Sequence, residues 1–146
     1  MFGIIKNKIG ETLDYTFHAG SANCRDLLII GHGVTGNKDR PFVIALADAV
    51  SASGINVLRF SFAGNGDSAG EVRDCTISKE VEDLHAVLSV VGEKDYRVTY
   101  AGHSMGGAVG VLTASKDSRI KFLISLAGMV STEKFYETEF GEETPD

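Results

Sequence analysis

Hydrophobic and polar positions are grouped in blocks along the chain, and these blocks predict strands and helices in turn. Continuous apolar runs such as Leu27–Ile30 are typical of parallel strands that are buried on both faces. Segments with an apolar residue every three or four positions predict amphipathic helices. The patterns predict strands at 4–9, 12–18, 27–30, 56–61, 97–101 and 121–127, and helices at 41–53, 78–91 and 105–115.

The order of these segments predicts the fold class. The first two strands form an antiparallel opening with a turn at Gly10–Glu11, and strands then alternate with helices. Such alternation indicates right-handed β-α-β units, and hence a mostly parallel sheet with helices on both faces. Helix 41–53 has Asp39 as a candidate N-cap, Pro41 in its first turn and Gly54 after its end. Segment 133–146 shows no clear periodicity.

One short segment between a predicted strand and a predicted helix is the strongest indication of chemistry. It reads Gly102-His103-Ser104-Met105-Gly106. A Gly-x-Ser-x-Gly box in this context is typical of a nucleophile elbow, where the serine lies on a sharp turn with a positive φ. Side chains two residues on either side would collide, which explains Gly102 and Gly106. The alternative is an ordinary glycine-rich turn.

A second glycine-containing turn could complete an oxyanion hole. His32-Gly33-Val34 follows the strand at 27–30, and the backbone amides of Val34 and Met105 are the candidate donors. The two amides should converge near the Ser104 hydroxyl. The alternative is a strand-to-helix turn that contains glycine for conformational reasons alone. We expect His32 itself to be a structural hydrogen-bonding residue.

The histidines are in the wrong part of the chain for a complete catalytic triad. In this kind of site the acid and the histidine base follow the serine along the chain. Here His18, His32, His85 and His103 all precede or adjoin Ser104. We expect packing or structural roles for His85 and His103. The sequence therefore predicts little or no esterase turnover by the 146 residues alone.

Composition excludes several other functions. Segment 133–146 carries a net charge of −5, so the rest of the chain contributes only −1 of the total −6 and has no basic surface for nucleic acid. The glycine-rich loop 63–70 lacks both a dinucleotide-binding and a P-loop pattern, and its Asp67 and Ser68 should brace the loop. Cys24 and Cys75 lack metal-ligand spacing and suit a reducing cytoplasm. We expect no metal, no cofactor, no signal peptide and no membrane span.

Three segments carry a family resemblance: His32–Asp39, Arg59–Ser68 and Gly102–Gly107. In order and spacing they resemble the serine aminopeptidase S33-like branch of the α/β-hydrolases, and in particular bacterial cinnamoyl or feruloyl esterase-like enzymes. The resemblance implies that Ser104 is the nucleophile and that the amides of Val34 and Met105 form the oxyanion hole. Ser61 stands where many members have aspartate.

Members of this branch continue with a cap, two more strands and the loops that carry the acid and the base. By this resemblance, residues 1–132 are the N-terminal portion of an α/β-hydrolase domain without the C-terminal strands and cap. Residues 133–146 are an acidic tail that resembles the start of a cap insertion. The chain is then truncated before the triad acid and base.

The resulting hypothesis is a serine hydrolase that acts on small carboxylic esters or other acyl compounds through an acyl-enzyme at Ser104. Two alternatives stay open: a non-catalytic fragment or binding module, and a half-enzyme completed by a second polypeptide. Strand 121–127 is apolar on both faces and suits the interior of a parallel sheet. With no later strand in this sequence to cover it, we expect this strand to mediate self-association, to aggregate or to bind the missing portion.

Overall fold

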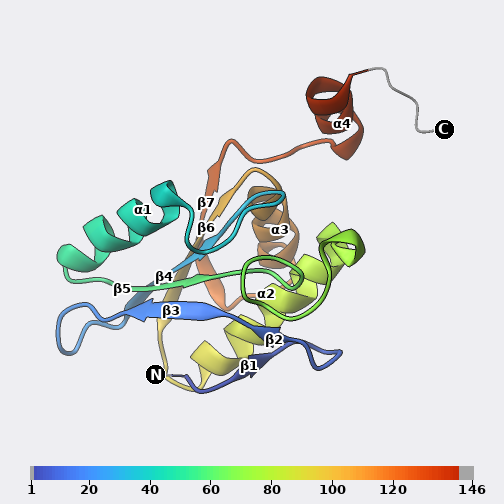
Figure 1. The fold of residues 1–146 in the computed structure, drawn as a ribbon. Coiled ribbons are helices and arrows are strands. Elements are labelled where there is room, and N and C mark those ends of the chain that lie inside the picture. The colour runs from blue at the N-terminus through green and yellow to red at the C-terminus, as the bar shows by residue number, and fades with distance from the viewer. Residues whose placement is uncertain (1, 142–146) are drawn as a thin grey trace.

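A five-stranded sheet forms the centre of the computed structural model, which describes residues 2–141 (Figure 1). Its strands lie in the spatial order β3 (Tyr15–His18), β5 (Asn56–Phe60), β4 (Asp26–Gly31), β6 (Arg97–His103) and β7 (Ile120–Leu126). The β3–β5 pair is antiparallel, and the other three neighbouring pairs are parallel. This arrangement confirms the mostly parallel sheet that the sequence predicts.

Helices cover both faces of this sheet, also as predicted (Figure 1). Helix α1 (Pro41–Ala52) packs on one face, where Val43 and Ala47 join an apolar cluster with residues of β4 and β5. Helices α2 (Ile77–Gly92) and α3 (Met105–Ala114) pack on the other face in a larger cluster that includes Tyr100. Between residues 2 and 141, the molecule has no helix with the length and apolar character needed to cross a membrane.

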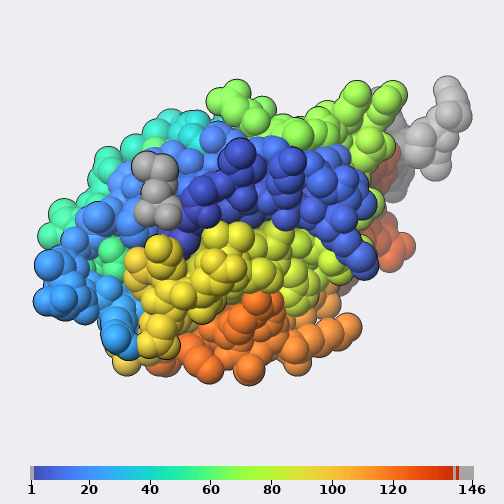
Figure 2. Space-filling view, turned by 90° about the horizontal axis from the view of Figure 1, so that it is seen from below, coloured from blue at the N-terminus to red at the C-terminus, as the bar shows by residue number. Residues whose placement is uncertain are grey.

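The N-terminal segment forms three short strands where the sequence predicts two. The first 13 residues contribute a separate hairpin, β1 (Ile5–Lys6) and β2 (Thr12–Leu13), which contacts α2. The predicted strand 12–18 is interrupted at Asp14, because β2 pairs with β1 whereas β3 pairs with β5. Viewed from below, this blue N-terminal segment lies alongside the yellow-green residues of α2 (Figure 2).

The helix boundaries follow the sequence with one correction. Thr76 caps α2 as its hydroxyl accepts a hydrogen bond from the Lys79 amide, and Gly54 follows α1 with a φ of 96°. Asp39 is not the N-cap of α1: that position belongs to Arg40, which makes no side-chain cap. The Asp39 carboxylate pairs with Lys38 and Arg59 instead.

The acidic tail contains a helix that the sequence analysis missed. Helix α4 (Thr132–Phe140) begins after Ser131, whose hydroxyl accepts a hydrogen bond of 3.2 Å from the Lys134 amide. A short 3-10 turn at Val72–Asp74 is a second small element without a prediction. Residues 142–146 of the predicted tail lie outside the described residues.

Strand β7 forms one edge of the sheet and differs from the buried strands β4 and β5. Only its first residue, Ile120, is buried, and residues 121–126 are exposed, including Phe122 at 59%. The orange residues that lead into β7 lie at a margin of the molecule in the view from below (Figure 2). Among the described residues, β7 therefore has a neighbouring strand, β6, on one side only.

Candidate active site

The turn from β6 into α3 places Ser104 in the strained conformation that the sequence predicts. Ser104 has φ 52° and ψ −116°, in a region that residues other than glycine rarely adopt. Its amide donates to the Leu126 carbonyl at 3.0 Å, and its carbonyl accepts from the amides of Gly107 and Met129 at 2.9 and 3.0 Å. These contacts hold the turn from both the helix and the neighbouring strand.

The flanking glycines are required by close backbone contacts. A Cβ atom added at Gly102 would lie 2.2 Å from the Gly106 carbonyl oxygen, and one added at Gly106 would lie 2.4 Å from the His32 carbonyl oxygen. Real Cβ atoms do not approach so closely, so backbone would have to move. The Tyr100 hydroxyl, which is buried, donates to the Gly106 carbonyl at 2.8 Å. The elbow is thus packed directly against the loop that follows β4.

That loop brings the second predicted feature next to the serine. A Cβ atom added at Gly33 would lie 3.2 Å from the Cβ atom of Ser104. Val34 follows Gly33 and lines the same cavity as Ser104. Met105 is the first residue of α3, where a backbone N–H has no partner within the helix. Convergence of the Val34 and Met105 amides on one oxygen site stays a prediction.

His32 anchors the loop and has the structural role expected of it. Its side chain is 1% exposed; its Nε2 accepts from the Phe62 amide at 3.0 Å, and its Nδ1 lies 2.7 Å from the Gly33 carbonyl. Burial lowers the pKa of this imidazole to about 4. At neutral pH the ring is therefore uncharged, with Nδ1–H donating and Nε2 accepting, and neither nitrogen is free to take a proton from Ser104.

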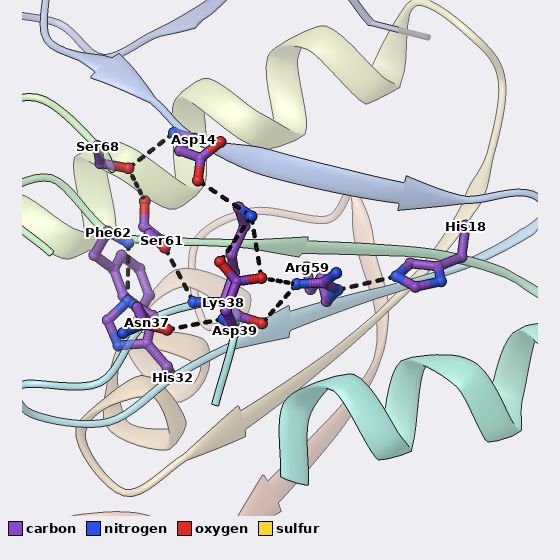
Figure 3. A network of polar contacts seen from close by, with 10 residues as sticks. All are labelled: Asp14, His18, His32, Asn37, Lys38, Asp39, Arg59, Ser61, Phe62 and Ser68. Atoms are coloured by element: carbon purple, nitrogen blue, oxygen red, sulfur yellow. Dashed lines mark hydrogen bonds and ion pairs between the residues drawn. The ribbon is translucent and has the colours of Figure 1, made fainter. Parts of the chain in front are cut away.

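A polar network around the buried residues Lys38, Arg59 and Ser61 fixes the far end of the same loop (Figure 3). The Lys38 amide donates to the Ser61 hydroxyl at 3.0 Å, and Arg59 donates to the Lys38 carbonyl at 2.9 Å. Arg59 also pairs with Asp39, and its Nε donates to His18 at 2.9 Å. The Lys38 ammonium lies 3.2 Å from Asp14 and 3.0 Å from Asp39. Residues 32–40 are thereby bound to β5 and to the segment around β3.

Sequence reasoning did not identify this network, although one signal was available. Arg59 lies between the apolar residues Leu58 and Phe60 of a buried strand, where a charged residue must have a partner. Ser68 was expected to brace its loop, and it does so: its hydroxyl donates to the Ser61 carbonyl at 2.7 Å and accepts from the Asp14 amide at 2.8 Å.

The cavity in front of Ser104 has a volume of about 340 Å³. Helix α4 contributes Phe135 and Glu139 to its wall, which the sequence analysis did not foresee. Its remaining lining residues come from the β4 loop, from the start of α1 and from the elbow: His32, Gly33, Val34, Gly36, Arg40, Phe42, His103 and Ser104. The cavity therefore places the Ser104 side chain beside the glycine-containing β4 loop and the phenyl rings of Phe42 and Phe135.

The other histidines have partners other than the serine hydroxyl. His103 packs edge-to-face on Phe42 with ring centres 5.0 Å apart, and His85 lies 3.1 Å from Asp117. Over residues 2–141, no histidine nitrogen forms a hydrogen bond with the Ser104 side chain. The same residues contain no cluster of three side chains that could hold a metal ion. Ser104 and the residues of the candidate oxyanion donors therefore lie together, and no histidine is hydrogen-bonded to the Ser104 hydroxyl within residues 2–141.

Comparison with known proteins agrees with this architecture. The parallel sheet, its helices and the strand-to-helix turn define an α/β-hydrolase fold. A profile of the serine aminopeptidase S33 family matches residues 22–141, and the chain belongs to this family.

Among similar structures, Est1E from Butyrivibrio proteoclasticus, solved with ferulic acid bound, has a TM-score of 0.82 and 28% identity. The match covers 92% of this chain and 56% of Est1E. A putative carbamate hydrolase, RutD of Azorhizobium caulinodans, is 28% identical over 86% of this chain and 45% of its own length. An uncharacterized 31.7 kDa protein of Escherichia coli is 26% identical over 84% of this chain and 44% of its own length. The chain spans under half the length of these curated relatives.

Proposed function

We propose that this chain carries the nucleophile and the oxyanion-binding part of a serine hydrolase that acts on carboxylic esters. The observation that carries the proposal is the left-handed backbone of Ser104, with a φ of 52°, at the junction of β6 and α3. This conformation costs on the order of 1–3 kcal/mol and persists only where the surrounding structure enforces it. Ser104 lines a cavity beside the β4 loop, where a strained nucleophile has a use.

In the proposed reaction, the Ser104 hydroxyl oxygen attacks the ester carbonyl carbon and its proton passes to a base. The amides of Val34 and Met105 are proposed to donate to the resulting oxyanion. The carbon–oxygen bond to the alcohol then breaks, and the alcohol leaves with a proton. Water hydrolyses the acyl-enzyme and regenerates the serine. Because no histidine nitrogen is hydrogen-bonded to the Ser104 side chain among the described residues, the proposed base in this chain is solvent.

The first prediction follows from this missing base. With p-nitrophenyl acetate, we expect slow acylation of Ser104 and low turnover, since deacylation also needs a base. Sites without a complete triad retain at most about 10³–10⁴-fold acceleration over water. Added imidazole should accelerate nitrophenol release, because it can accept the serine proton. Peptide mapping by mass spectrometry locates the acetyl group, and absorbance follows nitrophenol.

Two variants make this experiment specific. Ser104→Ala should abolish the acetyl adduct in its peptide and reduce imidazole-dependent release to the rate that imidazole gives without protein. Ser115→Ala removes an exposed hydroxyl at the other end of α3 and should change neither. Equal imidazole-dependent release from the Ser104→Ala variant would refute the assignment of the nucleophile.

A further inference from the structure

One buried tyrosine joins the two ends of the turn that carries Ser104. Tyr100 lies on β6 ahead of the serine, and its side chain is fully buried. Its hydroxyl donates to the carbonyl of Gly106, in the first turn of α3, at 2.8 Å. A carbonyl inside a helix already accepts from an amide of the next turn, so the phenol takes its second acceptor position. The hydrogen bond therefore links the strand before Ser104 directly to the helix after it.

Two glycines make the space that this side chain occupies. A Cβ atom added at Gly31, the last residue of β4, would lie 2.0 Å from the Tyr100 hydroxyl oxygen. One added at Gly110 in α3 would lie 2.5 Å from Cε1 of the tyrosine ring. The ring is thus confined between β4 and α3, which fixes the position of its oxygen. Burial raises the pKa of Tyr100 far above its usual range, with a smaller contribution from Glu80, so the hydroxyl stays a donor at neutral pH.

The Gly106 carbonyl lies next to the groups that the proposed reaction uses. Met105 precedes it as the first residue of α3, and the Met105 amide is one proposed oxyanion donor. The same carbonyl marks the close approach of α3 to β6, because a Cβ atom added at Gly102 would lie 2.2 Å from its oxygen. A small rotation of the first turn of α3 would therefore redirect both the Ser104 side chain and the Met105 N–H.

We propose that Tyr100 is a positioning residue for the reaction at Ser104, because its hydroxyl fixes the first turn of α3 relative to β6 and so directs the Met105 amide. The inference rests on the proposed function. Tyr100 is fully buried and is not among the residues that line the cavity in front of Ser104. It therefore acts through the backbone of the turn, without touching the ester.

Acylation of Ser104 by p-nitrophenyl acetate in the presence of imidazole tests the proposal. Tyr100→Phe removes one oxygen atom and keeps the ring. It should slow acylation about three- to tenfold per folded molecule, because small displacements of reacting groups are costly. Tyr15→Phe is the matched control, since its hydroxyl also donates to a backbone carbonyl, that of Gly3 at 2.9 Å. It lies on β3, which β5 and β4 separate from β6, and this variant should keep the original rate. Circular dichroism gives the folded fraction of each variant.

Hydrogen exchange at the turn separates positioning from a general loss of stability. The amides of Ser104 and Gly107 donate to the carbonyls of Leu126 and Ser104. In Tyr100→Phe both should exchange faster than the change in global stability accounts for, whereas Tyr15→Phe should not have this effect. Unchanged acylation per folded molecule, or equal slowing by the two variants, would overturn the proposal. An original chain that is never acylated would refute the proposed function instead, and unchanged exchange at these two amides would then refute the role of Tyr100.

Discussion

At the scale of single residues, the turn at Ser104 depends on the lack of a Cβ atom at Gly102 and Gly106. Gly102 and Gly106 face each other across the turn, and Gly106 also lies against the His32 carbonyl. The sequence allowed both glycines to be predicted, because the strand and helix around Ser104 were recognisable from their apolar patterns. It did not show that the obstructing atoms are mainly backbone carbonyls, since this depends on how closely β4 approaches α3.

The second prediction concerns the space around Gly106. Gly106→Ala should lower the free energy of unfolding by about 1–3 kcal/mol or more, because its Cβ atom would lie 2.4 Å from the His32 carbonyl oxygen. Gly92→Ala is the matched control, since a Cβ atom there has no neighbour within 4 Å. The control should be neutral or stabilising by up to about 1 kcal/mol. Urea denaturation measures both, and equal stabilities would contradict the proposed crowding.

At the scale of elements, the loop 32–40 is held by its neighbour β5 rather than by its own hydrogen bonds alone. Arg59 is 8% exposed and makes contacts with Lys38, Asp39 and His18. Because the loop also carries Val34, the proposed oxyanion donor depends on a side chain from a strand that does not itself line the cavity.

The third prediction tests this dependence. Arg59→Met should destabilise the protein by about 1–3 kcal/mol, since it leaves the Lys38 carbonyl without its charged donor and the Asp39 carboxylate with Lys38 as its remaining partner. Hydrogen exchange should accelerate in residues 33–40. Arg97→Met is the control: its pair with Asp26 is exposed and should contribute under about 1 kcal/mol. Unchanged exchange in the loop of the Arg59 variant would show that His32 and Ser61 suffice to hold it.

The elements also show where the pattern of apolar residues predicts secondary structure correctly and where it does not. The apolar runs of β4 and β5 were predicted within a few residues, because burial on both faces demands continuous hydrophobicity. The same pattern located β7, although residues 121–126 are exposed in the described part of the chain. Helix α4 was missed because its nine residues form no apolar stripe, with no buried residue among those described in it. Its start could have been recognised at Ser131, whose side chain caps the helix. The break at Asp14 has no local signal, since it reflects the choice of pairing partner.

At the scale of the whole molecule, one buried carboxyl group links stability to pH. Glu80 is 2% exposed, and its Oε2 has no hydrogen-bond partner among the described residues. Burial, with a smaller contribution from the nearby Asp83, raises the pKa of Glu80 to about 8. The carboxyl group is therefore protonated in the folded chain at neutral pH, and it ionises near pH 4.5 once the chain unfolds.

The fourth prediction follows from that difference. Between about pH 4.5 and 8 unfolding releases a proton, so this group makes the free energy of unfolding fall as pH rises, by up to about 1.4 kcal/mol per pH unit. Glu80→Gln should flatten the pH dependence and gain stability relative to the original chain toward pH 8. Glu82→Gln, at an exposed position of the same helix, should not. Urea denaturation at several pH values would reveal parallel curves if Glu80 were not protonated.

The candidate site was predictable only in part, because some of its residues are contiguous in the sequence and others are far apart. Ser104, Gly102, Gly106 and Met105 are contiguous, so one local pattern identifies them. Val34 was inferred because the ends of parallel strands meet at one edge of a sheet. The contributions of Phe135 and Glu139 to the cavity wall depend on how the segment after β7 returns over the elbow, and no spacing in the sequence specifies that path.

The central position of β4 has a consequence for biosynthesis. β4 pairs with β5 on one side and with β6 on the other, and Asp26 is opposite Arg97, 71 residues later. During translation, β4 must wait for both partners to emerge before its edges are covered. Such distant pairing is entropically costly and slow. The strained turn at Ser104 also has hydrogen bonds with Leu126 and Met129, so we expect Ser104 to reach its final geometry only after most of the described chain has left the ribosome.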